Sequence, residues 1–353
     1  MATSRLPAAT QPVTRRAGPP PAPPGAPPRA AHRRGERFIA AGFVAPLLVP
    51  FALFYVWPAL STLGGSLFEW TVFRPWRLSS PTGRPFVGID NYTDVLTSER
   101  FWTAALNTLV WLILFPALTT TVSLFVAVLI WQVARGGRWF RAVFVLPMTI
   151  SLTAIGVIWK LMYNPDYGTI DAVARTTRVD GAALDAGPLH AQASNWLSDP
   201  GFLDLGFARL SLVNAALVVA AFWGFTGFGV ITYTAGLTAV PNELLEAARV
   251  DGASWLQVVR HILVPMLRSS TVIVGVVSVI FALRTFDIVW VMTGGGPAND
   301  TEVLAVLLWK QAFAFLDAPL AGNATAIAVL ISAMMVLAAY PHLRNVVRQG
   351  PAR

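Results

Sequence analysis

The chain has 353 residues, of which 55% are hydrophobic and 12% are charged, and its formal net charge is +8. A soluble domain carries about 25% charged residues, so this composition excludes an ordinary soluble protein and indicates an integral membrane protein. The sequence contains no Cys, which excludes disulfides and thiolate metal sites. Its four His residues are too scattered to suggest a metal cluster, and we expect no metal site.

Residues 1–37 form a basic, Pro-rich segment at the N-terminus. They contain nine Pro and seven Arg with almost no bulky apolar residues. Such a segment cannot bury a core, and we expect a disordered tail.

Six charge-free runs follow, at 38–68, 103–134, 142–159, 210–242, 269–283 and 318–341. A helix needs about 20 apolar residues to cross the hydrocarbon core of a membrane. Four runs exceed that length, the third nearly reaches it, and the fifth reaches it only by continuing through Arg284 and Asp287 to about Val291. We therefore predict an all-α integral membrane protein with six transmembrane helices.

The distribution of basic residues predicts the orientation of these helices. With a cytoplasmic N-terminus, the inside segments hold sixteen of the 26 Lys and Arg residues, seven of them in 1–37. This bias fits the positive-inside rule, so we predict that both termini are cytoplasmic and that the basic balance reflects topology rather than nucleic-acid binding. The longer outside loops, about 69–102 and 163–209, are expected to be connectors that could contain short helices.

A polar, helix-patterned segment at 242–265 separates the fourth and fifth runs. Asn242 is a candidate cap for its first helix, and Gly252 is a candidate left-handed stop. Ser254 and Gln257 match a capping box that begins a second helix, which Pro265 limits. One face of that second helix is apolar and consists of Trp255, Val258, Val259, Ile262 and Leu263. From these residues alone, the segment is either a socket for a second protein or an amphipathic helix that anchors the fifth span.

The spacing within this segment resembles the Glu-Ala-Ala loop of binding-protein-dependent ABC importer permeases. The matching residues are Glu246-Ala247-Ala248, Gly252, Ile262 and Pro265, with Val264 where the family usually has Leu. The resemblance implies a coupling helix that docks on a cytoplasmic ATPase subunit. Glu246 would pair with a basic residue there, Ala247 and Ala248 would permit close approach, and Gly252 would supply the bend. The implied coupling set is Glu246, Ala247, Ala248, Asp251, Gly252, Ala253, Ile262 and Pro265.

A second group of motifs is similar to a permease subunit of carbohydrate importers, of the maltose and glycerol-3-phosphate type. It comprises Arg284-Thr285-Phe286-Asp287, Thr293-Gly294-Gly295-Gly296-Pro297, Thr301-Glu302, Gly88-Ile89-Asp90-Asn91-Tyr92 and Tyr163-Asn164-Pro165-Asp166-Tyr167-Gly168. The resemblance covers about 38–345, which we expect to be the transmembrane domain, followed by a cytoplasmic tail at 346–353.

The fourth and fifth runs contain candidates for a substrate path. Ionisable residues within a span usually face a cavity or a partner, and a sugar needs hydrogen-bonding groups beside aromatic surfaces. Arg284 and Asp287 are expected to share one helical face, either as a structural pair or as part of the path. The full candidate set is Trp223, Phe225, Phe228, Ser278, Phe281, Arg284, Thr285 and Asp287.

The sequence contains no phosphate-binding P-loop, since neither Lys160 nor Lys310 has the required context. We therefore expect a permease and not an enzyme, with no cofactor on this chain and with ATP and Mg²⁺ on partner subunits. The resemblance implies four partners: a second permease subunit, two ATPase subunits and an extracytoplasmic substrate-binding protein, in a bacterial cell membrane. Alternatives are an ABC permease for another solute class, a self-contained secondary transporter and a membrane-embedded enzyme.

Overall fold

A computed structural model describes residues 42–77, 85–132, 137–170, 196–197, 202–204, 209–314 and 320–349. The predicted tail at 1–37 lies outside these residues. The chain divides into two units, 1–59 and 60–353. The described part of the first unit is the start of an exposed apolar helix, Gly42–Gly65, whose last residues belong to the second unit. This helix contains the π-helical turn η1 (Ala52–Val56) and ends with α2 (Trp57–Gly65).

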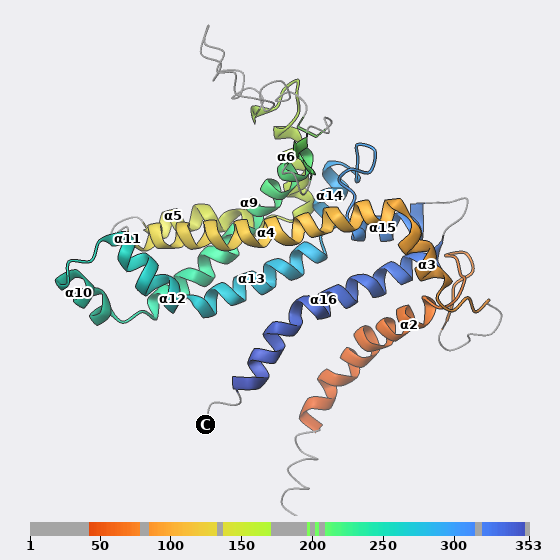
Figure 1. Ribbon diagram of the computed structural model, residues 1–353, viewed down its shortest axis with the longest axis horizontal. Helices are drawn as coiled ribbons and strands as arrows, with labels where there is room; N and C mark the ends of the chain where they lie inside the picture. The colour runs from red at the N-terminus through yellow and green to blue at the C-terminus, as the bar shows by residue number, and fades with distance from the viewer. Residues whose placement is uncertain are drawn as a thin grey trace, which may run out of the picture. The chain divides into compact units, whose positions relative to one another are not determined.

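Long apolar helices form the body of the second unit. α4 (Glu99–Gln132), α9 (Leu212–Thr238) and α13 (Arg268–Leu283) pack side by side, and α16 (Ala321–Gln349) contacts α13 (Figure 1). Among the described residues, four helices are long and apolar enough to cross a membrane, and up to six spans result if two bent helix pairs each count as one. The helical, multi-pass character of the chain is therefore as predicted.

The third charge-free run is not one straight helix. α5 (Gly137–Val145) leads into a 3-10 turn, η2 (Leu146–Thr149), and α6 (Leu152–Met162) then starts at an angle of 102° to the preceding helix. Pro147 lies at the start of the turn, where its fixed φ and missing N–H end the α-helical hydrogen bonding. Ser151 caps the new helix by accepting a hydrogen bond from the Ala154 backbone N–H at 3.3 Å.

The fifth run is also interrupted. α13 stops at Leu283, Arg284 is its C-cap, and α14 (Asp287–Met292) begins three residues later. Phe286 has φ −135° and ψ −59°, outside helical values. The prediction of one helix continuing to Val291 is therefore wrong, and so is the placement of Arg284 and Asp287 on one helical face. A second bend, of 68°, separates Trp255–Met266 from α13.

Shorter elements connect the long helices. Within the loop at 69–102 lies the short helix α3 (Asp90–Thr97), as expected for that loop. In the loop at 163–209, the described residues include a hairpin of two short strands, β1 (Phe202–Asp204) and β2 (Arg209–Ser211), with Leu203 paired to Leu210. This hairpin departs from the strictly all-α prediction. α15 (Leu304–Trp309) and the π-helical turn η4 (Lys310–Ala314) precede α16.

Small and polar residues set the spacing between the packed helices. The glycines of α9 allow close approach: a Cβ on Gly227 would lie 2.9 Å from the Phe144 carbonyl oxygen of α5. Helices in membranes use small residues for contact and polar side chains to hold neighbours together. Here the buried Asn214 donates from Nδ2 to Asn107 Oδ1 at 3.0 Å, which links α9 to α4.

Candidate functional site

The predicted coupling segment forms a distinct helical hook at one end of the second unit. It consists of α10 (Asn242–Val250), α11 (Trp255–Val258), the π-helical turn η3 (Val259–Leu263) and α12 (Val264–Met266). Figure 1 places α10 beyond the C-terminal end of α4, past α11, with α14 near the opposite end of α4. The hook therefore lies far along the helices from the break between α13 and α14.

Backbone hydrogen bonds fix the end of α10. Gly252 has φ +74°, its N–H donates to Arg249 O at 3.1 Å, and the Ala253 N–H donates to Ala248 O at 2.9 Å. This pair of bonds is a Schellman motif, so Gly252 is the left-handed stop that the sequence predicted. At the other end, Asn242 is the first residue of the helix rather than its cap. Pro241 occupies the cap position and makes no side-chain capping bond, so that prediction is wrong.

The side chains of α10 divide into an exposed set and a buried set. Glu246 and Ala247 are exposed, whereas Leu245 and Ala248 are buried against this chain. Of the Glu-Ala-Ala triplet, Glu246 and Ala247 thus offer their side chains to a partner. Asp251, Gly252 and Ala253 line a pocket of about 350 Å³ together with Ile262. The structure therefore gathers four of the predicted coupling residues around one depression.

The second helix of the hook packs mainly against the chain's own helices. Ser254 and Gln257 form the predicted capping box, in which the Ser254 N–H donates to Gln257 Oε1 at 2.7 Å. Four residues of the predicted apolar face pack against the core of this chain: Val258, Val259, Ile262 and Leu263. The fifth, Trp255, is 43% exposed and lies outside that core. Pro265 is exposed in α12, and the helix runs one residue past it, to Met266, before the bend at Leu267.

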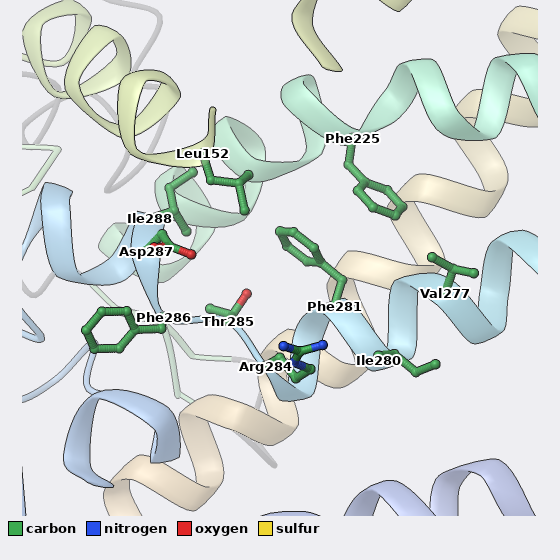
Figure 2. Close-up of a pocket in the computed structure, with 10 residues that line it drawn as sticks. All are labelled: Leu152, Phe225, Val277, Ile280, Phe281, Arg284, Thr285, Phe286, Asp287 and Ile288. Carbon is green, nitrogen blue, oxygen red and sulfur yellow. The ribbon is translucent and has the colours of Figure 1, made fainter. Parts of the chain in front are cut away.

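A cavity of about 300 Å³ opens where α13 and α14 break apart, and we call it the break cavity (Figure 2). Five predicted path residues line it: Phe225, Phe281, Arg284, Thr285 and Asp287. Arg284 and Asp287 lie on opposite sides of Thr285, and no ion pair joins them within the described part of the chain. Thr285 is buried, at 5% exposure, and its hydroxyl oxygen has no hydrogen-bond partner among the described residues.

Aromatic rings support one wall of the break cavity. The Phe281 ring stacks on Phe115 with centroids 4.7 Å apart, and Phe225 lies 5.1 Å from Phe281. Phe228 packs behind Phe225 at 5.3 Å without lining the cavity, and Trp223 meets Trp159 at 6.0 Å instead.

Ser278, a further candidate for the path, is fully buried and lies outside the lining. Its hydroxyl donates to Val274 O at 2.7 Å in its own helix. The structure therefore leaves Trp223, Phe228 and Ser278 out of the cavity.

The sequence prediction missed several lining residues, notably Leu152, Phe286 and Ile288. Each lies at or beside a helix break, so a prediction of unbroken spans cannot find it. One signal was present, because Arg284 and Asp287 suit the C-terminal and N-terminal ends of two helices better than the middle of one.

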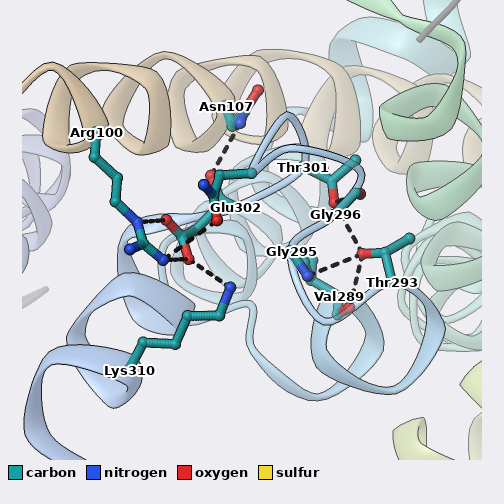
Figure 3. Close-up of polar contacts among 10 residues, drawn as sticks. Arg100, Asn107, Val289, Thr293, Gly295, Gly296, Thr301, Glu302 and Lys310 are labelled. Carbon is teal, nitrogen blue, oxygen red and sulfur yellow. Dashed lines mark hydrogen bonds and ion pairs between the residues drawn. The ribbon is translucent and has the colours of Figure 1, made fainter. Parts of the chain in front are cut away.

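A cluster of ionised side chains around a buried glutamate secures the loop that follows α14 (Figure 3). Glu302 is fully buried. Its carboxylate accepts hydrogen bonds from Arg100 Nε at 2.6 Å and Arg100 Nη2 at 2.9 Å, and Lys310 Nζ lies 2.8 Å from it. The Glu302 carbonyl oxygen also accepts from Asn107 Nδ2 at 2.9 Å. We call Arg100, Glu302 and Lys310 the ionic clamp, since it ties α4 and η4 to one loop.

Comparison with known proteins shows which family the chain resembles. Residues 119–345 match the family model described as "binding-protein-dependent transport system inner membrane component". An osmoprotective compounds uptake permease protein of Synechocystis sp. is 31% identical, over 88% of this chain and 100% of the relative. A xylose/arabinose import permease protein of Haloferax volcanii is 30% identical, over 86% and 87%.

The fold also resembles a solved structure. A bacterial ABC transporter involved in the import of the acidic polysaccharide alginate matches with a TM-score of 0.69 and 17% identity, covering 92% of this chain and 100% of that one. At that identity the likeness concerns the fold alone.

Proposed function

Because the chain belongs to the family of binding-protein-dependent transport system inner membrane components, we propose that it is the transmembrane permease subunit of an ATP-driven ABC importer. The four long apolar helices, the bent pair Trp139–Thr149 and Leu152–Met162 counted as one span, and α13 without the helix 255–266 then give six spans. The positive-inside bias of the sequence supports cytoplasmic termini and a cytoplasmic position for the hook formed by 242–266. The transmembrane domain is taken to cover 38–345.

The observation that carries this proposal is the exposed, rigidly held end of α10. Glu246 and Ala247 face outward from a helix whose C-terminus is closed by the Gly252 turn, and the following helix packs onto this chain's own core. An exposed carboxylate on a fixed helix suits a basic residue of a partner. A displacement of α10 by a partner would be transmitted to α13 through the helix 255–266.

The partners follow from this role. A second permease subunit would complete the translocation path, and two ATPase subunits would bind ATP and Mg²⁺, for which this chain contributes no P-loop. An extracytoplasmic binding protein would deliver the substrate. Closure of the ATPase subunits would move the coupling helices together, and the path would alternate between inward- and outward-facing states by rigid-body motion around a site near the membrane midplane.

For the substrate, we propose a sugar or a related polyol or glycerol-phosphate compound. The xylose/arabinose permease among the relatives supports this class. The break cavity supports it as well, because an unpartnered Thr285 hydroxyl lies between two charged groups and beside the rings of Phe225 and Phe281. Hydroxyl-rich rings need such a combination of polar groups and apolar faces.

The test is ATP-driven uptake by the assembled transporter with single substitutions in the hook. Glu246→Lys and Gly252→Pro should abolish uptake while substrate capture by the binding protein is unchanged. Glu243→Lys is the matched control, because it reverses the other carboxylate of α10 and should retain uptake. Full uptake by the Glu246 and Gly252 variants would disprove the coupling role.

A further inference from the structure

Two motifs far apart in the sequence meet around a second cavity, of about 390 Å³. One is the segment after α6 that begins with Tyr163-Asn164-Pro165, and the other is the loop 293–297 after α14. The closeness of α6 to α14 brings them together, because Gly156 packs directly against Val291 and Met292. We call this the loop cavity; it is lined by different residues from the break cavity.

Both walls of the loop cavity are held by hydrogen bonds. On one side, Asn164 Oδ1 accepts from the backbone N–H groups of Asp166 at 2.9 Å and Tyr167 at 3.3 Å. On the other, the Thr293 and Thr301 hydroxyl oxygens lie 2.8 Å apart, and Thr301 donates to Gly296 O at 2.6 Å (Figure 3). The ionic clamp fixes the next residue, Glu302. These two sides of the cavity are therefore held in place before a ligand binds, which lowers the entropic cost of binding.

The polar groups left over in the loop cavity are hydrogen-bond donors. Lys160 Nζ makes one long bond, 3.4 Å, to Val291 O, and an ammonium has three protons to donate. The Asn164 amide nitrogen has no acceptor in the described part of the chain, and neither does the buried indole N–H of Trp196. None of the described lining residues is acidic.

Aromatic surface and charge complete this chemistry. The Trp196 ring packs on Tyr163 with centroids 5.8 Å apart, and Tyr163 packs on Trp159 at 5.4 Å. Burial raises the pKa of the Tyr163 hydroxyl, which therefore stays neutral and donates to Ala216 O at 3.3 Å. Lys160 is consequently the charged group among the described lining residues.

We propose that the loop cavity is a second carbohydrate site, specific for a sugar ring that carries an anionic group such as a carboxylate. The ring would pack against Trp196, and the anionic oxygens would accept from Lys160 and Asn164. This proposal rests on the proposed carbohydrate class. Beyond that class, it specifies that the sugar carries an anionic group and that it binds at a site separate from the break cavity.

The test measures binding of D-glucuronate and of neutral D-glucose to the full chain in lipid nanodiscs, by saturation-transfer difference NMR with empty nanodiscs as background. We expect the wild type to prefer D-glucuronate. Lys160→Cys should weaken D-glucuronate binding about tenfold, as expected for the loss of a charge-assisted hydrogen bond. The chain has no other Cys, so aminoethyl methanethiosulfonate would restore an ammonium at this position alone, and binding should return.

Two controls separate this site from the rest of the molecule. Arg284→Gln removes the cation of the break cavity, where total sugar binding can fall, but the preference for D-glucuronate over D-glucose should persist because Lys160 supplies it. Asp94→Cys, exposed on α3, should show no effect of the reagent. The proposal is overturned if the wild type binds both sugars equally or binds neither. It is also overturned if Lys160→Cys keeps the preference, or if Arg284→Gln abolishes the preference. Because no ATP is involved, these outcomes are independent of the uptake test for coupling.

Discussion

A single side chain can affect both the stability of the fold and the binding of substrate, and a substitution can change one without the other. Thr285 is the clearest case, since its buried hydroxyl has no partner and an unsatisfied buried polar group costs about 1–3 kcal/mol. Thr285→Val should therefore leave the melting temperature unchanged or raise it, while substrate-stimulated ATP hydrolysis falls about tenfold, the effect of losing roughly one good hydrogen bond to substrate.

A matched substitution shows whether that effect belongs to the cavity. Thr232→Val removes a hydroxyl that donates to Phe228 O at 2.8 Å in its own helix. It should leave ATP hydrolysis near the wild-type rate. If the two variants behave alike in the ATPase assay, Thr285 does not contact substrate.

For the ionic clamp we predict a loss of stability, whereas Thr285→Val is expected to lose activity without losing stability. Glu302→Gln keeps the shape of the side chain but leaves Arg100 and Lys310 without their buried counter-ion. Breaking a buried ion pair on one side costs about 3–5 kcal/mol, and the partial exposure of both cations reduces this to about 2–3 kcal/mol. Thermal unfolding of the detergent-solubilised chain should show a clear loss of stability. The exposed Glu99→Gln serves as control, and equal melting temperatures for the two variants would contradict the role of the clamp.

Gly252 provides a backbone prediction. Its φ of +74° disfavours any residue with a Cβ, although no atom would lie within 4 Å of that Cβ. Gly252→Ala should thus cost about 1–2 kcal/mol through conformation alone. Gly275→Ala, in the middle of α13 with ordinary contacts, should cost nothing or stabilise the helix. Comparable losses in thermal stability for both variants would show that the turn is not strained in this way.

At the level of helices, the effect of adding a side chain to a glycine of α9 depends on which atoms of the neighbouring helix that glycine faces. A Cβ on Gly227 would meet α5 backbone, whereas on Gly236 it would meet the side-chain ends of Ser270 and Leu267, which can move. Gly227→Ala should therefore reduce the yield of monodisperse protein in size-exclusion chromatography much more than Gly236→Ala. Equal yields would mean that α5 adjusts its backbone without penalty.

Helix type and position could be predicted from the sequence, but helix continuity could not. Apolar runs locate α4, α9 and α16, because long stretches without charge have few other solutions in a membrane. The same reading treats 142–159 and 269–291 as straight spans, since hydropathy does not register a proline-led 3-10 turn or a non-helical Phe286. The break cavity lies at those interruptions. Five of its residues were predicted from their charge, hydroxyl or aromatic character, whereas Leu152 lines the cavity only because the chain bends just before it, and that bend was not predicted.

At the scale of the whole molecule, the family and the Gly252 turn could be predicted from short motifs, whereas the ionic clamp could not. Arg100, Glu302 and Lys310 are about 200 residues apart at their widest, and nothing in their local sequence indicates that they meet. The motifs at 163–168 and 293–297 contribute to the family resemblance, but their sequences likewise do not indicate that they meet. Packing of α6 on α14 gives them a shared surface.

The central claim is that the hook at 242–266 couples this chain to an ATPase, and cross-linking of the assembled transporter tests it most directly. The chain has no Cys, so a single Ala247→Cys variant can carry a photo-activated cross-linker on the exposed face of α10. We predict a cross-linked product with the ATPase subunit that increases with ATP, and no such product from Asp94→Cys. Absence of the ATPase among the products at position 247, or equal products at both positions, would contradict the claim.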